Sequence, residues 1–160
     1  MAKWQVLLGL AGWITVSLLA GAIGSLATAS SVSTWYASEL QKPDWTPPGW
    51  VFGPVWTILY VMMGTAAWLV WRRHGFRGAA LPLSLFLAQL VLNAAWSLVF
   101  FGLRAPGAAL VELVVLWLAI AATGAAFSRR DKWAALLLIP YLAWTSFAAA
   151  LNFAIWRMNA

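Results

Sequence analysis

The chain alternates between long apolar runs and short polar breaks. Crossing a bilayer core about 30 Å thick takes ~20 helical residues, and five runs are long enough to do so. They cover residues 4–28, 51–71, 79–101, 106–127 and 133–156. The breaks between them hold arginine, glycine, proline and aspartate, which interrupt apolar helices. The pattern predicts an all-α membrane protein, with residues 1–160 forming a single transmembrane domain built as a five-helix bundle.

Three of the four connections are short, so the helices that they join should be antiparallel neighbours. The first connection, residues 29–50, is about twenty residues, which is long for a helix–helix connection. Its prolines restrict the backbone, and it lacks the Gly/Ser composition of a flexible linker. Two interpretations remain open. The loop is an interfacial anchor, because tryptophan and tyrosine prefer the membrane interface, or it is a structured lid over a pocket between the helices.

Composition agrees with a lipid-solvated chain. Apolar residues make up 64% of the sequence and charged residues 9%, against roughly 25% charged residues in soluble domains. The chain has no cysteine and one histidine, His74, so disulfides and clustered Cys/His metal sites are excluded. The net charge of +6 does not require a nucleic-acid partner, because basic residues collect in the cytoplasmic loops of membrane proteins.

The N-terminal segment has two interpretations. Lys3, the apolar run after it and the small residues 27–29 resemble a signal peptide with a cleavage site. The apolar run is longer than the usual ~7–15 residues of such a peptide, which favours a first membrane helix. We therefore expect an integral multi-pass protein of a bacterial-type cell membrane, with the outer membrane as the alternative.

Polar and aromatic residues recur at helical spacing within the spans. Gln89, Asn93 and Trp96 share one face of the third span, because residues three or four apart are neighbours on a helix. The same periodicity joins Tyr141, Trp144, Ala148 and Asn152 in the fifth span, while the second contributes Trp56 and Tyr60. The direction of each span predicts which residues lie in the half of the membrane beneath the first connection: Trp56, Asn93, Trp96, Glu112 and Asn152. The asparagines fit either a pocket or interhelical hydrogen bonding, and the tryptophans either a pocket or core packing.

Glu112 is the only acidic residue inside a predicted span. Intramembrane carboxylates are costly and usually functional. Two states are open for it: protonation, or pairing with Arg104 near the start of the fourth helix. We expect a structural role near the mouth of the pocket.

Two blocks of sequence are specific. The first is Trp35-Tyr36 followed by Lys42-Pro43-Asp44-Trp45-Thr46-Pro47-Pro48, and the second is Pro140-Tyr141-Leu142-Ala143-Trp144 followed by Leu151-Asn152. With Gln89, Asn93, Trp96 and Phe100-Phe101-Gly102, they resemble the translocator protein family (TspO/MBR), also called tryptophan-rich sensory proteins or peripheral-type benzodiazepine receptors. The resemblance covers essentially the whole chain. It implies a homodimeric five-helix membrane protein that binds porphyrins such as protoporphyrin IX or haem, and sterol-like or benzodiazepine-type ligands, as a sensor or transporter.

The resemblance also implies a ligand site, and no required cofactor or metal. Together with the polar faces, it predicts the binding residues Trp35, Tyr36, Trp45, Trp50, Phe52, Gly53, Val55, Trp56, Tyr60, Gln89, Asn93, Trp96, Val115, Tyr141, Trp144, Ala148, Leu151 and Asn152, with Ser25 and Thr28 of the first helix. No catalytic residue is predicted. In some relatives, tryptophans matching Trp56 and Trp144 are linked to light-dependent porphyrin breakdown, so a redox role for both in porphyrin degradation is the alternative function.

The sterol motif of animal relatives falls on residues 151–157. This chain has Phe153 and Ala154 where those proteins have tyrosines. Because the motif calls for a tyrosine, sterol recognition through this segment is in doubt.

Basic residues are unequally divided between the two sides of the predicted bundle. Seven lie on the side of the N-terminus and three on the other; the seven are Lys3, Arg72, Arg73, Arg77, Arg129, Arg130 and Lys132, and the three are Lys42, Arg104 and Arg157. Because basic residues concentrate in cytoplasmic loops, we predict that the N-terminus is inside and the C-terminus outside. A reporter that is active only in the cytoplasm should be inactive when fused to the C-terminus, and activity there would contradict this orientation.

Overall fold

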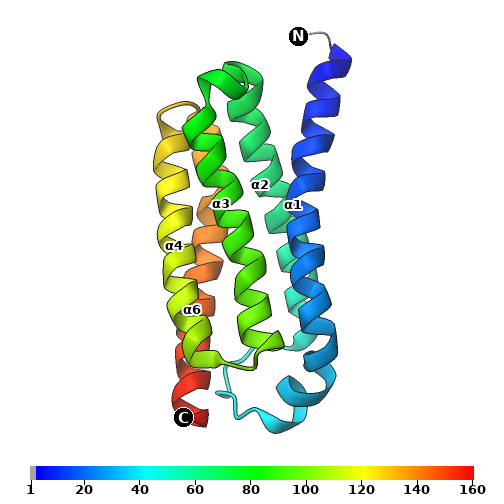
Figure 1. Ribbon diagram of the computed structural model, residues 1–160, viewed down its shortest axis with the longest axis vertical. Helices are drawn as coiled ribbons and strands as arrows, with labels where there is room; N and C mark the ends of the chain where they lie inside the picture. The colour runs from blue at the N-terminus through cyan, green and yellow to red at the C-terminus, as the bar shows by residue number, and fades with distance from the viewer. Residues whose placement is uncertain (1–2) are drawn as a thin grey trace.

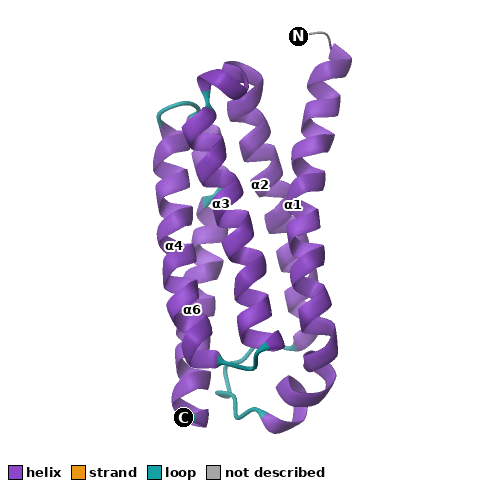
Figure 2. Ribbon diagram, viewed as in Figure 1, coloured by secondary structure: helices purple, strands orange, loops and turns teal. Residues whose placement is uncertain are grey.

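The protein is a bundle of long helices. The structure, a computed structural model, describes residues 3–160, and within that range it contains no strand (Figure 2). In order, the helical elements are α1 (Lys3–Ser31), η1 (Val32–Glu39), α2 (Gly49–Gly78), α3 (Ala80–Ser97), η2 (Leu98–Gly102), α4 (Pro106–Ser128), α5 (Lys132–Leu137) and α6 (Ile139–Asn159). The segments η1 and η2 are π-helical continuations of α1 and α3. Five helical segments are long and apolar enough to cross a membrane, which confirms the predicted fold class.

The helices run side by side along one axis, and the N- and C-termini lie at opposite ends (Figure 1). One end, which we call the loop end, carries the first connection, the η2–α4 turn and the C-terminus. The other, the arginine end, carries the α2–α3 and α4–α5 turns. α1 packs against α2 and α3, and α4 packs against α3 and α6. Short turns therefore produce antiparallel neighbours, as the sequence pattern predicts.

The first helical segment is longer than the hydrophobic run suggests. It continues past residue 28 to Glu39, so that only residues 40–48 of the first connection lie outside helix. Polar side chains in this stretch bond to their own helix: Ser38 Oγ donates to the carbonyl of Thr34 at 2.7 Å, and Thr34 Oγ1 to that of Ser30 at 3.2 Å. Polarity marks where the apolar core of the bilayer ends, but the backbone ladder continues until the Leu40 N–H, which donates to the Trp35 carbonyl at 3.0 Å. The segment with Pro43, Pro47 and Pro48 follows and cannot continue it.

α2 also extends beyond the predicted end at Trp71, to Gly78. Within it, Gly75 has φ 64° and ψ −177°. Side chains other than glycine are strongly disfavoured in this conformation. Gly75 therefore turns the chain sharply after the membrane-spanning part of α2 and begins the connection to α3.

Small, aliphatic and aromatic side chains fill the space between the helices. Met63, Ala66 and Val70 of α2 are fully buried, together with Phe86 of α3 and Phe127 of α4. Large apolar side chains cover the outside; Leu26, Val91 and Val111 are each more than two-thirds exposed, at 76%, 70% and 68%. An exterior of this kind matches lipid and not water.

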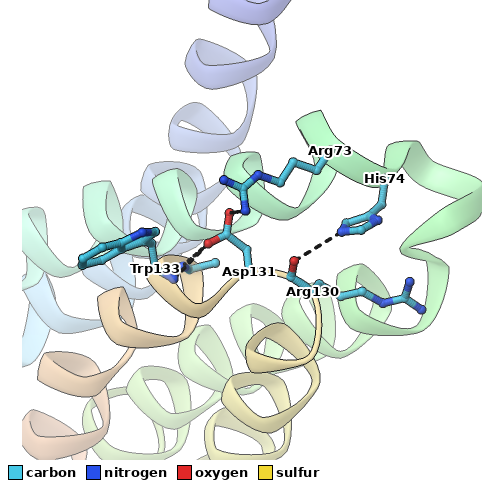
Figure 3. Close-up of polar contacts among 6 residues, drawn as sticks. Arg73, His74, Arg130, Asp131 and Trp133 are labelled. Atoms are coloured by element: carbon cyan, nitrogen blue, oxygen red, sulfur yellow. Dashed lines mark hydrogen bonds and ion pairs between the residues drawn. The ribbon is translucent and has the colours of Figure 1, made fainter.

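One ion pair stabilises the arginine end (Figure 3). Arg73 Nη1 lies 2.8 Å from Asp131 Oδ2, and the Asp131 side chain is fully buried. The second carboxylate oxygen, Oδ1, accepts hydrogen bonds from the backbone N–H groups of Trp133 at 2.9 Å and Ala134 at 3.3 Å. Asp131 thus caps α5. Next to it, His74 Nε2 lies 3.4 Å from the carbonyl oxygen of Arg130. These contacts hold the end of α2 against the α4–α5 turn.

Close packing of α1 on α2 depends on Gly64. A Cβ at this position would lie 2.6 Å from the Cα of Ile14 and 2.8 Å from the carbonyl oxygen of Trp13, both backbone atoms that cannot rotate away. We expect Gly64→Ala to destabilise the bundle by about 1–3 kcal/mol, the usual range for overpacking. The loss should appear as an earlier transition in unfolding by sodium dodecyl sulfate.

Gly124→Ala in α4 is the matched control, because a Cβ there meets nothing within 4 Å. This change should be neutral, or stabilising by up to ~1 kcal/mol through helix propensity. Equal destabilisation by both changes would contradict the close approach at Gly64.

Candidate functional site

A cavity of about 500 Å³ opens inside the bundle toward the loop end. It lies between α1, α2, α6 and the α3–η2 segment, with η1 contributing Val32 and Tyr36. No residue of α4 within the described chain lines it. Its walls are mainly aromatic and aliphatic, formed by Leu18, Gly21, Ala22, Ser25, Thr28, Val32, Tyr36, Gly49, Phe52, Gly53, Trp56, Thr57, Tyr60, Asn93, Trp96, Ser97, Phe100, Phe101, Trp144, Phe147, Ala148, Leu151, Asn152 and Ile155.

A chain of buried hydrogen bonds closes the inner end of this cavity. The Tyr60 hydroxyl donates to Asn93 Oδ1, and Asn93 Nδ2 donates to the Tyr141 hydroxyl at 2.9 Å. Tyr141 in turn donates to Gln89 Oε1 at 2.9 Å. The four side chains come from α2, α3 and α6, and each is at most 8% exposed. The faces predicted on the third and fifth spans therefore meet, and their polar groups satisfy one another in a region without water.

Two tryptophans stand on the α2 and α6 sides of the cavity. The Trp56 ring stacks on Tyr60 with 5.6 Å between centroids and meets the edge of Tyr141 at 6.1 Å. The Trp144 ring lies 6.0 Å from Phe52 in an edge arrangement and 5.4 Å from Phe147. These contacts orient the indoles before any ligand enters.

A third tryptophan links α3 to α6. The Trp96 ring stacks on Phe100 at 5.3 Å, and its indole N–H donates to Asn152 Oδ1 at 3.2 Å. Asn152 Nδ2 donates to the carbonyl oxygen of Pro106 at 2.7 Å. Asn152 therefore joins α6 to the start of α4 and orients Trp96. It both lines the cavity and makes interhelical hydrogen bonds.

The α1 wall depends on small residues. A Cβ on Gly21 would overlap the Tyr60 ring, and one on Gly24 would lie 3.0 Å from Ser97 Oγ. Ser25 and Thr28 line the cavity, but their hydroxyls donate to the carbonyls of Ala22 at 2.7 Å and Gly24 at 3.0 Å. The α1 wall is thus close to the opposite helices and offers few free donors.

The first connection is attached firmly to the loop end. Leu40 is buried at 8% exposure and packs with Phe100, Leu151 and Ile155. The backbone of Gln41 exchanges two hydrogen bonds with the Asn159 side chain, at 3.0 Å and 2.8 Å. A turn closed by Thr46 N to the Pro43 carbonyl at 3.0 Å follows. Tertiary contacts thus keep the loop at the end of the bundle next to the cavity.

Many of the residues predicted for the site line the cavity. They are Tyr36, Phe52, Gly53, Trp56, Tyr60, Asn93, Trp96, Trp144, Ala148, Leu151 and Asn152, with Ser25 and Thr28. Gln89 and Tyr141 lie directly behind the wall, in the hydrogen-bond chain. Val55 packs against the main core.

The other predicted residues lie elsewhere. Trp35 packs against Phe100 at 5.8 Å, and Trp45 is 51% exposed beside Phe147. Trp50 is 76% exposed, and Val115 on α4 is 49% exposed. Each of these four belongs to an aromatic or apolar stretch, and such a stretch does not show which side of its element faces the interior.

Sequence reasoning did not assign several lining residues to the site. Ser97 and Phe100 share the helix face of Asn93 and Trp96, and that spacing was the available signal. Gly21 is a small residue in an apolar span, and such a residue indicates close helix packing without indicating a cavity. Phe147 and Ile155 gave none, because they are apolar residues within an apolar span.

Glu112 lies outside the cavity lining. Both of its carboxylate oxygens are shielded and have no hydrogen-bond partner among the described residues. The pairing with Arg104 considered from the sequence is not formed; the guanidinium of Arg104 lies over the Trp35 ring, 6.0 Å from its centroid.

Tyr141→Phe tests the hydrogen-bond chain. It would leave Gln89 Oε1 without its hydroxyl donor and Asn93 Nδ2 without its acceptor, so we expect destabilisation of about 1–2 kcal/mol in unfolding by sodium dodecyl sulfate. Tyr36→Phe is the control, since no hydrogen bond of that hydroxyl is found within residues 3–160, and it should cost less than about 0.5 kcal/mol. Similar losses of stability in both variants would show that the buried hydrogen bonds of Tyr141 contribute nothing specific.

Comparison with known proteins identifies the family. Residues 13–157 match the TspO/MBR family. The chain is 46% identical to the tryptophan-rich protein TspO of Chlorobaculum tepidum, over 96% of this chain and 97% of the relative. It is 50% identical to the human translocator protein, over 78% of this chain and 75% of that protein. Identity to the tryptophan-rich sensory protein of Cereibacter sphaeroides is 39%, over 92% of each chain. This chain therefore belongs to the TspO/MBR family of integral membrane sensory and translocator proteins.

Proposed function

We propose that the cavity at the loop end binds porphyrins and other flat hydrophobic ligands, and that the protein acts on them as a membrane sensor or transporter. The observation that carries this proposal is an aromatic-walled cavity of about 500 Å³ enclosed by helices, with its polar groups already paired at the inner end. The names of the relatives, translocator protein and tryptophan-rich sensory protein, agree with a ligand-responsive membrane protein.

Stacking is the main interaction that this cavity offers. Trp56, Trp96 and Trp144 are each held by a neighbouring aromatic ring. Pre-ordered aromatic faces favour a planar aromatic ligand, because little side-chain entropy is lost on binding. Sterol-like and benzodiazepine-type molecules would use the same apolar area with less stacking.

The polar groups of a porphyrin would lie toward the loop end. Asn93 and Asn152 are committed to Tyr60, Tyr141, Trp96 and Pro106, so buried carboxylates would find few donors inside. Lys42 and Arg157 belong to the loop and to the end of α6, where they can neutralise carboxylates that remain near water. The first connection acts in this proposal as the lid over the site.

The proposal includes assembly as a homodimer in a bacterial-type cell membrane, with the N-terminus inside. The exposed apolar exterior of α1 supports a second copy or lipid as its neighbour, since Leu7, Leu19 and Leu26 are 65%, 55% and 76% exposed. The excess of basic residues at the arginine end supports the orientation.

Binding of protoporphyrin IX to the purified protein in detergent tests the proposed site. Trp56→Phe and Trp144→Phe should each raise the dissociation constant about two- to tenfold, because each removes part of a stacking contact worth about 0.5–1.5 kcal/mol. Quenching of tryptophan fluorescence measures the binding. The variants are compared by their dissociation constants and not by the amplitude of quenching, because removing any tryptophan lowers that amplitude.

Trp133→Phe is the matched control for these variants. Trp133 is 58% exposed and lies at the arginine end, next to Asp131 (Figure 3). Its replacement should leave the dissociation constant unchanged. Equal constants for wild type, Trp56→Phe and Trp144→Phe would sink the proposal that this cavity holds the porphyrin.

A further inference from the structure

A second cavity lies at the arginine end, opposite the proposed porphyrin site. It has a volume of about 450 Å³ and lies between the α2–α3 turn and the α4–α5 turn. Arg77, Arg129 and Arg130 line it together with Gly78, Leu81 and Pro82. Three guanidinium side chains from two separate turns therefore surround one cavity.

These three arginines have no counter-charge in the described chain. The chain has four acidic residues, and Asp131 is the only one at this end. Its carboxylate is occupied by Arg73 and by the N-terminus of α5. No ion pair, side-chain hydrogen bond or ring contact is found for Arg77, Arg129 or Arg130 within residues 3–160. Figure 3 shows the guanidinium of Arg130 pointing away from Asp131.

Among the other basic residues of this end, Arg73 pairs with Asp131. Arg72 lies over the Trp68 ring at 4.4 Å, and Lys132 over the Trp133 ring at 5.3 Å. Three positive charges without a partner among the described residues thus lie together at this cavity. Placing like charges around one cavity is unfavourable unless an anion occupies it.

The backbone holds the two turns together. The Arg73–Asp131 ion pair and the contact of His74 with the Arg130 carbonyl join the end of α2 to the α4–α5 turn. Gly75, with φ 64°, redirects the chain so that Arg77 lines the same cavity as Arg129 and Arg130. These contacts give the cavity a defined frame.

The cavity also lies where the apolar spans end. Leu81, which lines the cavity beside the arginines, is a large apolar side chain that is 69% exposed. A ligand suited to this place combines a negative head with hydrocarbon tails. Free inorganic phosphate would use the guanidinium groups but leave the neighbouring apolar surface uncovered.

We propose that this cavity binds the headgroup of an anionic phospholipid. The phosphate lies among Arg77, Arg129 and Arg130, whose planar guanidinium groups each present paired N–H donors to phosphate oxygens. The acyl chains extend over the exposed Leu81. Because the two turns belong to different helix pairs, a bound lipid bridges them and stabilises the arginine end of the bundle.

The test uses the full chain in a neutral detergent, which removes the general surface charge of a membrane. Native mass spectrometry measures the retention of added dioleoyl phosphatidylglycerol and, separately, of dioleoyl phosphatidylcholine. We expect wild type to prefer phosphatidylglycerol. Each arginine near an anionic lipid contributes roughly fivefold in affinity, from about 1 kcal/mol per residue. The variant R77Q/R129Q/R130Q should therefore bind phosphatidylglycerol roughly a hundredfold more weakly, with phosphatidylcholine binding unchanged.

The control K3Q/R72Q/K132Q removes the same charge from the same end but leaves the cavity intact. It should keep the preference for phosphatidylglycerol. Equal loss in both triple variants would mean diffuse attraction and would overturn the site, as would an unchanged preference in R77Q/R129Q/R130Q. If that triple variant fails to fold, R77Q alone, with the frame contacts intact, should weaken phosphatidylglycerol binding about fivefold, and no change would count against the site.

Inorganic phosphate serves as the competitor. Displacement of phosphatidylglycerol by phosphate at similar concentrations would show that the cavity recognises a free anion, and would overturn the assignment to a lipid. Failure of phosphate to compete, together with the arginine dependence, would support the proposal.

Discussion

An unpaired polar group in the hydrocarbon core of a bilayer costs several kcal/mol, and the rest of this structure depends on how the polar side chains of α2, α3 and α6 find partners. Tyr60, Asn93, Tyr141 and Gln89 donate and accept in sequence across α2, α3 and α6. Hydrogen bonds between membrane helices contribute only about 1 kcal/mol each. Their larger effect is positional, because each partner has one place in which its bonds can be made, and this fixes the rotation of three helices.

That arrangement accounts for the cavity beside it. With the amides and hydroxyls satisfied by one another, the surfaces left facing the interior at the loop end are indoles, phenyl rings and small α1 residues. Gly21 and Gly24 bring α1 close to Tyr60 and Ser97. The bulky residues Trp56, Trp96 and Trp144 pack against neighbouring rings, so they stand at the sides of the space without filling it. A proposed ligand therefore meets a surface that is largely ordered before binding.

The two ends of the bundle solve different problems. At the loop end, Leu40 and the pairing of Gln41 with Asn159 hold an irregular segment against the helices. At the arginine end, one buried carboxylate, Asp131, serves both as a helix cap and as the partner of Arg73. No second carboxylate is present there, and this leaves three arginines of neighbouring turns around one cavity. At the arginine end, charge is thus balanced at the buried Asp131 and unbalanced at the exposed arginines.

The sequence by itself determined the fold class and much of the proposed site. Apolar length predicted five spans, because the thickness of the bilayer sets a minimum length. Helical periodicity placed Asn93 with Trp96 and Tyr141 with Asn152, since residues three and four apart share a face whatever the tertiary structure. The specific blocks around Trp35 and Pro140 identified the family. The sequence did not predict that η1 continues to Glu39, because hydropathy records the end of the apolar core and not the end of the backbone ladder.

Only the tertiary structure decided which side of each element faces the cavity. Trp45, Trp50 and Val115 look as suitable as Phe52 or Trp144 in the sequence, yet their side chains lie at the surface, because orientation depends on how neighbouring helices rotate and pack. The pairing of Arg73 with Asp131, 58 residues apart by their numbers, and the convergence of Arg77 with Arg129 and Arg130 are likewise properties of two turns brought together. The physical reason is the same in each case: contacts between distant segments depend on the packing of whole helices, which no local pattern encodes.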